Sequence, residues 1–316
     1  MKLSFIFPVK NEAENLPTLL DRIYAVIKEN GYDYEIIAVD DGSQDKSFSI
    51  LKEVAGKDKK FKVLRFLVNA GQTSAISAGI EYSTGNILIP IDADLENDPR
   101  DIPLLLAKMD EGYDVVSGWR KNRWAGKFLT RRLPSIIANR MISKITGVRL
   151  HDYGCTLKVY RREVIKGVPL YGEMHRFIPA YASWRGAKVT EVPVHYEPRR
   201  FGKSNYSISR TFRVLLDLLL IKFLDKYMNR PIHFFGGLGF ISFGIGTLAG
   251  VIAVILKILE IRSFVSTPLP IFSALFIIVG VQLAAMGIIA EMAMRTYYES
   301  QGKKPYLIKE SINVNK

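Results

Sequence analysis

The residues best suited to chemistry in this chain include two carboxylates one residue apart, Asp92 and Asp94. They directly follow the apolar stretch 87–91, which is typical of a buried strand. Ligands of open α/β folds bind at the carboxyl ends of such strands, where carboxylates can serve as hard oxygen ligands. The pair therefore predicts a Mg²⁺ or Mn²⁺ site that connects the protein to a substrate diphosphate. A solvated turn is the alternative for so short a motif.

Two further acids, Glu12 and Asp41, follow the first two predicted strands, 3–9 and 34–39. Carboxylates at these positions can accept hydrogen bonds from a base or a ribose. The chain contains neither the glycine fingerprint of dinucleotide-binding folds nor a P-loop, so neither motif explains phosphate binding. These acids and the aspartate pair together predict a nucleotide that is held at strand ends beside a metal ion.

Strand-like and helix-like stretches alternate through the N-terminal part of the chain. The predicted strands are 3–9, 34–39, 62–66 and 87–91. The first two are separated by an apolar stripe at helical spacing, formed by Leu16, Leu19, Leu20, Ile23 and Ile27. This alternation predicts βαβ units and a mostly parallel sheet, hence an α/β fold. The carboxyl ends of parallel strands lie at one edge of a sheet, which would bring the acids together.

The composition limits the possible partners of the chain. Its 316 residues carry a formal net charge of +13 and give a pI near 9.6, so an anionic partner is expected. Nucleic acid, anionic lipid and a phosphorylated substrate all qualify on charge alone. The uneven distribution of the hydrophobic residues favours a membrane and argues against nucleic acid.

Two stretches without charged residues, 234–256 and 263–290, each exceed the roughly 20 residues that span a bilayer. They predict two transmembrane helices, and a pair of buried helices in a soluble protein is the alternative. The connecting segment 257–270 contains few basic residues, whereas both outer flanks are rich in lysine and arginine. The positive-inside rule therefore predicts that the large N-terminal region and the C-terminus are cytoplasmic.

Two basic amphipathic stretches precede the membrane helices. The stretch 207–228 has apolar and basic residues at helical spacing, which predicts a helix in the membrane interface, or else one packed against soluble protein. The stretch 127–145 is either a solvated surface helix or a helix near an anionic membrane or substrate.

Several motifs occur together and in order along the chain. They are 7–12 (Phe-Pro-Val-Lys-Asn-Glu), 39–43 (Val-Asp-Asp-Gly-Ser), 69–71 (Asn-Ala-Gly), 92–94 (Asp-Ala-Asp), 152–155 (Asp-Tyr-Gly-Cys), 173–177 (Glu-Met-His-Arg-Phe) and 200–206 (Arg-Phe-Gly-Lys-Ser-Asn-Tyr). This set closely resembles the inverting glycosyltransferases of the GT-A fold, in the large family that includes cellulose and chitin synthases. With two C-terminal spans added, the chain is similar to the polyprenyl-phosphate glycosyltransferases. That branch contains dolichol-phosphate mannose synthase and bacterial bactoprenol glucosyltransferases.

The resemblance covers residues 1–295. Together with the hydropathy and charge patterns, it predicts that the chain has four parts. They are a GT-A catalytic domain (1–206), amphipathic juxtamembrane helices (207–230), two transmembrane helices (231–295) and a cytoplasmic C-terminal tail (296–316). The glycine-rich spans also predict a homo-oligomer, with a tetramer as the hypothesis.

The resemblance also implies roles for individual residues. In chain order they are Pro8, Glu12 and Asp41 for the nucleoside, Asp92 for the nucleotide, Asp94 for the metal ion, Arg120 and Arg123 for the diphosphate or the acceptor, and Arg200, Lys203 and Ser204 for the acceptor phosphate. Arg176 is expected at the site on charge grounds, because a dianionic acceptor that approaches a diphosphate needs cations to offset the repulsion. The chain departs from the family pattern at Glu96 and Asn205, where Gln and Lys are frequent. The second departure makes Lys203 the cation expected at the acceptor.

Asp152 matches the position usually assigned as the catalytic base in this family. An alcohol acceptor would need such a base, but a phosphate monoester has a second pKa of about 6 and arrives largely dianionic. We therefore expect Asp152 to position a sugar hydroxyl or a cation rather than to accept a proton.

The expected activity is the metal-dependent, inverting transfer of one sugar from a nucleotide-sugar donor to a polyprenyl phosphate at the cytosolic membrane face. Glucose from UDP-glucose is the first choice, and GDP-mannose and a UDP-linked aminoarabinose-type donor are alternatives. A processive polysaccharide synthase would carry a Gln-X-X-Arg-Trp signature, which the chain lacks. A non-enzymatic membrane scaffold that binds nucleotide sugars is the remaining alternative, and the intact Asp92, Asp94 and Asp152 argue against it.

Overall fold

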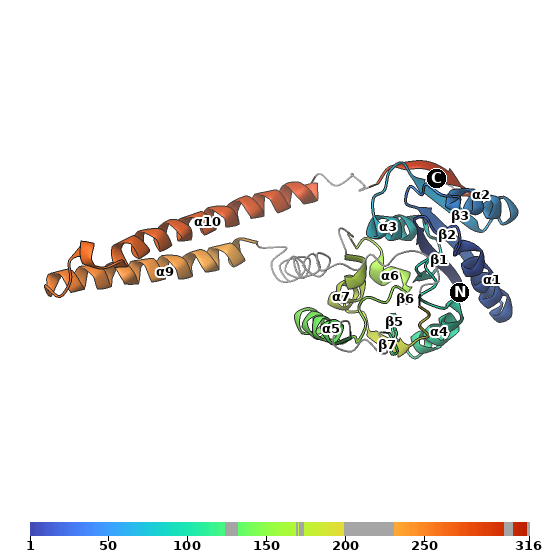
Figure 1. Cartoon of the computed structure of the whole chain (residues 1–316), viewed down its shortest axis with the longest axis horizontal. Coiled ribbons are helices and arrows are strands. Elements are labelled where there is room, and N and C mark those ends of the chain that lie inside the picture. Colours follow the sequence, from blue (N-terminus) through green and yellow to red (C-terminus); the bar gives the residue numbers. More distant parts are fainter. Residues whose placement is uncertain (124–131, 169, 171–173, 199–230, 300–305, 315–316) are drawn as a thin grey trace. The chain divides into compact units, whose positions relative to one another are not determined.

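The computed structural model describes residues 1–123, 132–168, 170, 174–198, 231–299 and 306–314. The chain divides into two compact units, Met1–Leu218 together with Lys304–Lys316, and Leu219–Lys303. The first unit contains an α/β sheet, and the second contains two long helices (Figure 1). The interfacial helix predicted within 207–228 lies outside the described residues.

An eight-stranded sheet runs through the described part of the first unit, in the order β7-β5-β6-β4-β1-β2-β3-β8. Its strands are β1 (Lys2–Val9), β2 (Asp33–Asp40), β3 (Phe61–Phe66), β4 (Ile87–Pro90), β5 (Val115–Trp119), β6 (Lys158–Arg161), β7 (Val189–Pro193) and β8 (Ile308–Ile312). Four strand pairs are parallel, whereas β6 runs antiparallel to β4 and β5, and β8 runs antiparallel to β3. The sheet is mixed but mostly parallel, which confirms the predicted α/β class.

Helices cover both faces of this sheet. The helical elements are α1 (Leu16–Asn30), α2 (Ser47–Lys57), α3 (Gln72–Tyr82), the 3-10 helix η1 (Pro99–Asp101), α4 (Ile102–Asp110), α5 (Leu133–Thr146), α6 (Arg162–Ile165), the 3-10 helix η3 (Met174–Phe177) and α7 (Ile178–Trp184). Alternate residues of β1, among them Leu3, Phe5 and Phe7, pack in one core with α1, α2 and α4. On the other face, α3 lies so close that a Cβ at Gly79 would overlap the Ile6 side chain.

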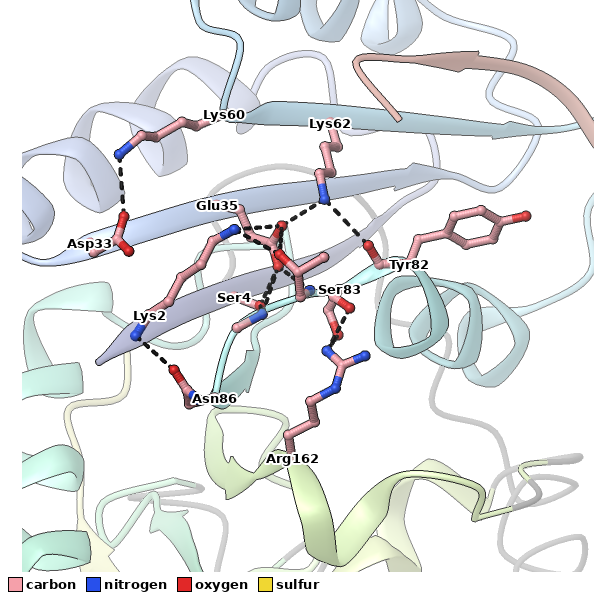
Figure 2. Close-up of polar contacts among 12 residues, drawn as sticks. Lys2, Ser4, Asp33, Glu35, Lys60, Lys62, Tyr82, Ser83, Asn86 and Arg162 are labelled. Carbon is pink, nitrogen blue, oxygen red and sulfur yellow. Dashed lines mark hydrogen bonds and ion pairs between the residues drawn. The ribbon is translucent and has the colours of Figure 1, made fainter. Parts of the chain in front are cut away.

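The amino-terminal edge of the parallel strands holds a buried carboxylate, Glu35 (Figure 2). It accepts hydrogen bonds from Ser4 Oγ and Lys62 Nζ, both at 2.6 Å, and from the Gly85 N–H at 3.0 Å. Burial alone would raise the pKa of Glu35, but the hydrogen bonds from Lys62, Ser4 and Thr84 outweigh burial and lower this pKa to about 2. These contacts join β1, β2, β3 and the turn before β4, so the cluster holds the sheet together at the edge opposite the strands' carboxyl ends.

The second unit consists, in its described part, of α9 (Pro231–Ile258) and α10 (Leu269–Glu299), with the 3-10 helix η4 (Phe264–Ser266) between them. The segments Phe234–Ile258 and Leu269–Ala290 are long and apolar enough to cross a membrane, and most of their residues are exposed. Core helices of a soluble protein would bury this apolar surface, so its exposure favours two membrane helices. The finding agrees with the two predicted spans.

Small residues bring α9 and α10 into close contact. A Cβ at Gly239 would lie 2.8 Å from Gly280 O, and a Cβ at Gly246 would lie 2.9 Å from Ser273 O. The Ser273 hydroxyl also donates to Gly246 O at 2.8 Å. In contrast, a Cβ at Gly244 would meet nothing within 4 Å. Part of the glycine pattern that predicts an oligomer therefore serves the contact between the two helices of one chain.

Candidate active site

The candidate site lies at the carboxyl ends of β1, β2 and β4, which are adjacent and parallel. Val9 and Asp40 are register partners at the ends of β1 and β2. The Asp41 N–H donates to Val9 O at 2.9 Å, so the segments that follow these two strands begin side by side. This arrangement confirms that parallel strands bring their ends to one edge, as expected from the alternation of elements.

Asp41 is buried in the turn after β2, where the loop after β3 surrounds it. Its Oδ1 accepts from the Ala70 N–H at 2.6 Å, and its Oδ2 accepts from the Gly71 N–H at 3.0 Å and from Asn69 Nδ2 at 2.9 Å. Burial raises the pKa of Asp41, although the N–H groups of Ala70 and Gly71 act in the opposite direction. The motif at 69–71 therefore holds the carboxylate of Asp41 in place.

Pro8 and Glu12 lie on β1 and on the loop after it. Pro8 is partly exposed, and Glu12 Oε2 accepts from Asn15 Nδ2 at 2.6 Å. The Glu12 N–H donates to Ser47 Oγ at 2.9 Å, which fixes this loop to the start of α2. Lys10 Nζ, in the same loop, donates to the backbone oxygen of Asp41 at 3.0 Å. Pro8 near the end of β1, Glu12 in the loop after it and Asp41 in the turn after β2 thus lie at the same edge of the sheet.

Asp92 and Asp94 follow β4, and their side chains are held in different ways. Asp92 Oδ1 accepts from Gln72 Nε2 and Asp92 Oδ2 accepts from Thr156 Oγ1, both at 2.7 Å. Asp94 Oδ1 accepts from the Glu96 N–H at 3.0 Å. The orientation of Asp92 therefore depends on α3 and on the segment before β6, whereas Asp94 is part of its own turn.

The fit of a metal ion depends on what these two acids can supply. Among the residues that the structure describes, no group of three or more His, Cys, Asp and Glu side chains could hold a metal ion. Mg²⁺ often binds through one or two protein carboxylates and takes its other ligands from substrate phosphates and water. Asp92 and Asp94 fit a divalent ion that binds together with a diphosphate.

Arg120 connects Glu96, which follows the aspartate pair, to Asp152. Its Nε and Nη2 donate to Asp152 Oδ2 and Oδ1 at 2.8 and 3.1 Å, and its Nη1 donates to Glu96 Oε2 at 3.0 Å. Arg123 Nη2 donates to the same Glu96 oxygen at 3.2 Å. A Cβ at Gly154 would lie 3.4 Å from Asp152 Oδ1 and 3.5 Å from Arg120 Nη2, so the glycine packs directly against this pair. A continuous network therefore runs from the Asp94 turn to Asp152.

The electrostatics of this pair bear on the predicted role of Asp152. Burial alone would raise the pKa of Asp152, but the charge and hydrogen bonds of Arg120 outweigh burial and lower this pKa to about 2. Arg120 is also buried, and the charges of Asp152 and its other neighbours hold the Arg120 pKa well above its ordinary value. Asp152 is ionised at neutral pH and is a weak proton acceptor, because an efficient base has a pKa near the working pH.

A cavity of about 790 Å³ opens beside the pair of Arg120 and Asp152. Its basic lining residues are Arg120, Lys121, Arg123, Arg132, Arg140, Lys144 and Arg149. Of the described residues that line it, only Asp152 is acidic. A concave surface lined by one sign of charge attracts ligands of the other sign, so this cavity suits an anionic ligand. The basic stretch predicted at 127–145 supplies part of that lining through α5.

The remaining predicted site residues are Arg176 and the three assigned to the acceptor. Arg176 lies in η3 and lines, with Gly154 and Lys158, a small cavity of about 10 Å³. The acceptor residues Arg200, Lys203 and Ser204 lie outside the described residues.

Three residues of the site are absent from the predictions made from the sequence. Gln72 and Thr156 hold Asp92, and Lys158, on β6, is 2% exposed and donates to Cys155 O. Burial lowers the pKa of Lys158 below its ordinary value. Gln72 could have been found, because it directly follows the motif at 69–71. No sequence motif marks Thr156 or Lys158, because their positions depend on the pairing of β6 with β4 and β5.

Comparison with known proteins connects this geometry to a family. Residues 4–168 match glycosyl transferase family 2. The chain is 39% identical to dodecaprenyl-phosphate galacturonate synthase of Rhizobium johnstonii, over 98% of this chain and 93% of that protein. It is 37% identical to undecaprenyl-phosphate 4-deoxy-4-formamido-L-arabinose transferase of an Enterobacter species, over 99% of this chain and 94% of that protein.

Solved structures resemble the fold at much lower sequence identity. One is glucosyl-3-phosphoglycerate synthase of Mycobacterium tuberculosis in complex with Mn²⁺, UDP-glucose and phosphoglyceric acid. It aligns with a TM-score of 0.54 at 16% identity, over 70% of this chain and 79% of that chain. This likeness, together with the mixed sheet, confirms the predicted GT-A fold. The chain belongs to glycosyl transferase family 2, in the group that contains the two prenyl-phosphate sugar enzymes named above.

Proposed function

We propose that the protein transfers one sugar from a UDP-sugar to a polyprenyl phosphate, with inversion at the anomeric carbon and with a divalent metal ion. The observation that carries this proposal is the cationic cavity beside Asp152, joined through Arg120 and Glu96 to the Asp94 turn. The donor diphosphate would bind at Asp92 and Asp94, and the anionic acceptor would bind in the cavity. The network of charged residues would then contact both substrates. The names of both relatives above, which specify a prenyl phosphate and a sugar, support this acceptor.

The donor would bind at the carboxyl edge of the sheet. Asp41 accepts from loop 69–71, and a carboxylate has room for a further donor such as the imide N–H of uracil. Pro8 and Glu12 would hold the rest of the nucleoside, and Asp92 would face the nucleotide. Crystal structures of the mycobacterial neighbour that contain Mn²⁺ and UDP support a metal and a uridine nucleotide. Asp94 would bind Mg²⁺ or Mn²⁺, and the bound ion would neutralise charge on the leaving diphosphate.

The acceptor phosphate would occupy the cationic cavity. Bringing a dianionic phosphate toward a diphosphate is repulsive, and the basic lining residues offset that repulsion. Arg140 and Lys144, on α5, belong to this lining, and we assign them to the acceptor together with Arg200, Lys203 and Ser204. Arg123 and Arg176 would add to the positive potential around the diphosphate.

Asp152 would position other groups and would not accept a proton. Its carboxylate is held by Arg120, and its pKa of about 2 leaves it little tendency to take a proton. The phosphate acceptor needs no base, because a phosphate monoester with a second pKa of about 6 is largely dianionic at neutral pH. The role of Asp152 would be to fix Arg120 and to orient the sugar at the mouth of the cavity.

The identity of the sugar is the finer part of the proposal. The family resemblance alone favours glucose, but the names of the two relatives specify galacturonate and an arabinose derivative. In their pyranose forms, D-galacturonate and L-arabinose derivatives share an axial substituent at the fourth ring carbon, which glucose holds equatorially. We therefore place a sugar of this configuration ahead of glucose and of GDP-linked mannose.

The membrane arrangement completes the proposal. The catalytic unit and the C-terminus would lie on the cytoplasmic side, as the distribution of basic residues around the two spans predicts. We keep a homo-oligomer, with a tetramer as the hypothesis, because glycines such as Gly244 are free of contacts with the other helix of the same chain. Light scattering in mild detergent tests this part, and a monomer would contradict it.

A transfer assay tests the function. The purified protein would receive undecaprenyl phosphate, Mg²⁺ or Mn²⁺ and one radiolabelled donor at a time: UDP-galacturonate, UDP-glucose, UDP-4-deoxy-4-formamido-L-arabinose or GDP-mannose. We expect label in the lipid phase from a UDP-sugar, abolished by EDTA and lowered about a hundredfold or more by Asp94→Asn. Labelled polymer in the aqueous phase would indicate a processive synthase. Metal-dependent nucleotide binding without transfer from any donor would indicate a scaffold.

A further inference from the structure

The C-terminal segment, expected from the sequence as a tail, forms the edge strand β8 of the catalytic sheet (Figure 1). It runs antiparallel to β3, with Val63 opposite Ile312 and Phe66 opposite Ile308. Beyond the paired residues, the Leu67 N–H donates to Leu307 O at 2.9 Å. The strand is therefore bonded to the first residue of the loop that follows β3.

Tyr306, just before β8, joins the last residue of β3 to α3. Its ring stacks on Phe66 with a centroid distance of 4.9 Å and an interplanar angle of 10°. Its hydroxyl donates to Glu81 Oε2, on α3, and the residue is 6% exposed. Tyr306 therefore packs on the last residue of β3 and bonds to the helix that begins where the loop ends.

The loop after β3 has little apolar anchoring of its own. Leu67 and Val68 are 54% and 64% exposed, so they do not fix the loop by burial. A Cβ at Gly42 would lie 3.2 Å from the Asn69 N, which shows how closely the loop backbone approaches the turn that carries Asp41. A displacement of the loop would therefore also displace the turn that carries Asp41.

The residues at the far end of the same loop donate the hydrogen bonds to Asp41. Ala70 and Gly71 supply backbone N–H groups and Asn69 supplies its side-chain amide. A chain of direct contacts thus leads from Tyr306 through Phe66 and the loop to the carboxylate of Asp41.

We infer that β8, through Tyr306, positions the loop 67–71 for binding of the nucleotide at Asp41, so that the C-terminal segment is part of the donor site. This inference rests on the proposed role of Asp41 in holding the nucleoside. Tyr306 is a positioning residue in this scheme, because it acts on the nucleotide only through the loop. Loss of Tyr306 would weaken donor binding and leave acceptor binding unchanged.

The test compares variants of the full-length protein in detergent by titration with UDP in the presence of Mn²⁺. Tyr306→Ala removes both the ring stack and the hydroxyl, and we expect the Kd for UDP to rise about tenfold. Tyr306→Phe keeps the stack and loses only the bond to Glu81, so a smaller rise of about threefold is expected. In the transfer assay, KM for the donor should rise in the same order while KM for undecaprenyl phosphate stays constant.

Asn313→Ala is the matched control at the other end of β8. Asn313 Nδ2 donates to Ala55 O at 2.7 Å and to Phe61 O at 2.9 Å, far along the strand from the loop. This variant should lower thermal stability and leave the Kd for UDP unchanged. An equal loss of UDP affinity in Asn313→Ala and Tyr306→Ala would overturn the inference, because β8 would then act only through overall stability.

Asp41→Asn separates this inference from the function on which it rests. We expect this variant to lose most UDP affinity. If it does and Tyr306→Ala binds UDP like the wild type, the inference on β8 is wrong and the donor site stands. If Asp41→Asn binds UDP normally, the nucleotide is held elsewhere, and the proposed donor site and the inference are both wrong.

Discussion

Arg120 holds both carboxylate oxygens of Asp152, through Nε at 2.8 Å and Nη2 at 3.1 Å, while its third nitrogen donates to Glu96. A bidentate arginine fixes both the position and the ionised state of its carboxylate partner. The residue that matches the family's usual base is thus held in the state least suited to accept a proton, and this relationship gives the first prediction.

Asp152→Asn should lower kcat about tenfold, because it weakens the contact that orients Arg120, and should leave the pH dependence of the rate unchanged. The folded-state pKa of Asp152 is about 2, below the ordinary value of 3.8, so Asp152 stays ionised across the working range. The measurement is the rate of lipid-linked product between about pH 5 and 9, where the acceptor's pKa of about 6 should set the acidic limb. Complete loss of activity with a displaced pH profile would instead identify Asp152 as a base.

Thr156→Val should raise KM for the donor about tenfold, because it removes the hydroxyl that donates to Asp92 Oδ2 at 2.7 Å. Gln72→Ala should act in the same direction through Asp92 Oδ1. Thr156→Ser keeps the hydroxyl and is the matched control, so it should retain the wild-type KM. Initial rates at varied donor concentration provide the measurement, and similar values for Thr156→Ser and Thr156→Val would contradict the role.

Arg140→Ala and Lys144→Ala should each raise KM for polyprenyl phosphate several-fold, while KM for the donor stays constant, because both side chains line the cationic cavity. The effect should weaken at high salt, since screening reduces the contribution of exposed charges. Lys28→Ala removes the same charge from the end of α1, outside the cavity, and serves as control. A rise in KM for the donor instead would indicate that the cavity binds the donor and not the acceptor.

Glu35→Ala should lower the free energy of unfolding by about 3 kcal/mol, because it removes the acceptor of the partly buried Lys62 ammonium and of the buried Ser4 hydroxyl. The pKa of Glu35 falls from 4.5 to about 2 on folding, so its stabilisation is fully present above about pH 4.5 and is lost as the pH falls toward 2. Glu35→Gln should therefore reduce the acid sensitivity of thermal unfolding. Glu53→Gln removes an exposed partner of Lys57 and should change neither quantity measurably.

Gly246→Val should lower the thermal stability of the membrane unit, because its side chain would meet Ser273 O and the Ile277 backbone, while Gly244→Val should leave that stability unchanged. Both glycines lie on α9, and both variants introduce the same side chain. Any difference between them therefore reports the contact with α10. Unfolding in detergent gives the comparison. Equal effects of both substitutions would show that helix propensity, not packing between α9 and α10, decides the outcome.

The main features of the fold could be predicted because its central strands are buried on both faces. Such strands are short apolar runs, and 87–91 and 34–39 were found for this reason. β8 was missed, because 308–312 reads Ile-Lys-Glu-Ser-Ile, and a half-exposed edge strand has no distinctive composition. β6 is shorter still, and its antiparallel position between β4 and β5 depends on the whole sheet.

The candidate site was predictable where its residues lie in local motifs. Asp41 and Asp92 were placed correctly at strand ends, since a strand carries the residue after it to the edge of the sheet. The pairing of Arg120 with Asp152 could not be predicted, because it joins residues 32 positions apart across separate elements. Glu96, noted only as a departure from the family pattern, turns out to accept from two arginines.

The place of β8 in the chain has a consequence for biosynthesis. During translation this strand is made after every other strand of the sheet and after both apolar helices. Until then, β3 is an unpaired edge, and the loop at 67–71 lacks the contact with Tyr306. The eight-stranded sheet is therefore completed only after the two apolar helices have been synthesised, and a nascent chain that lacks these helices still has an incomplete sheet.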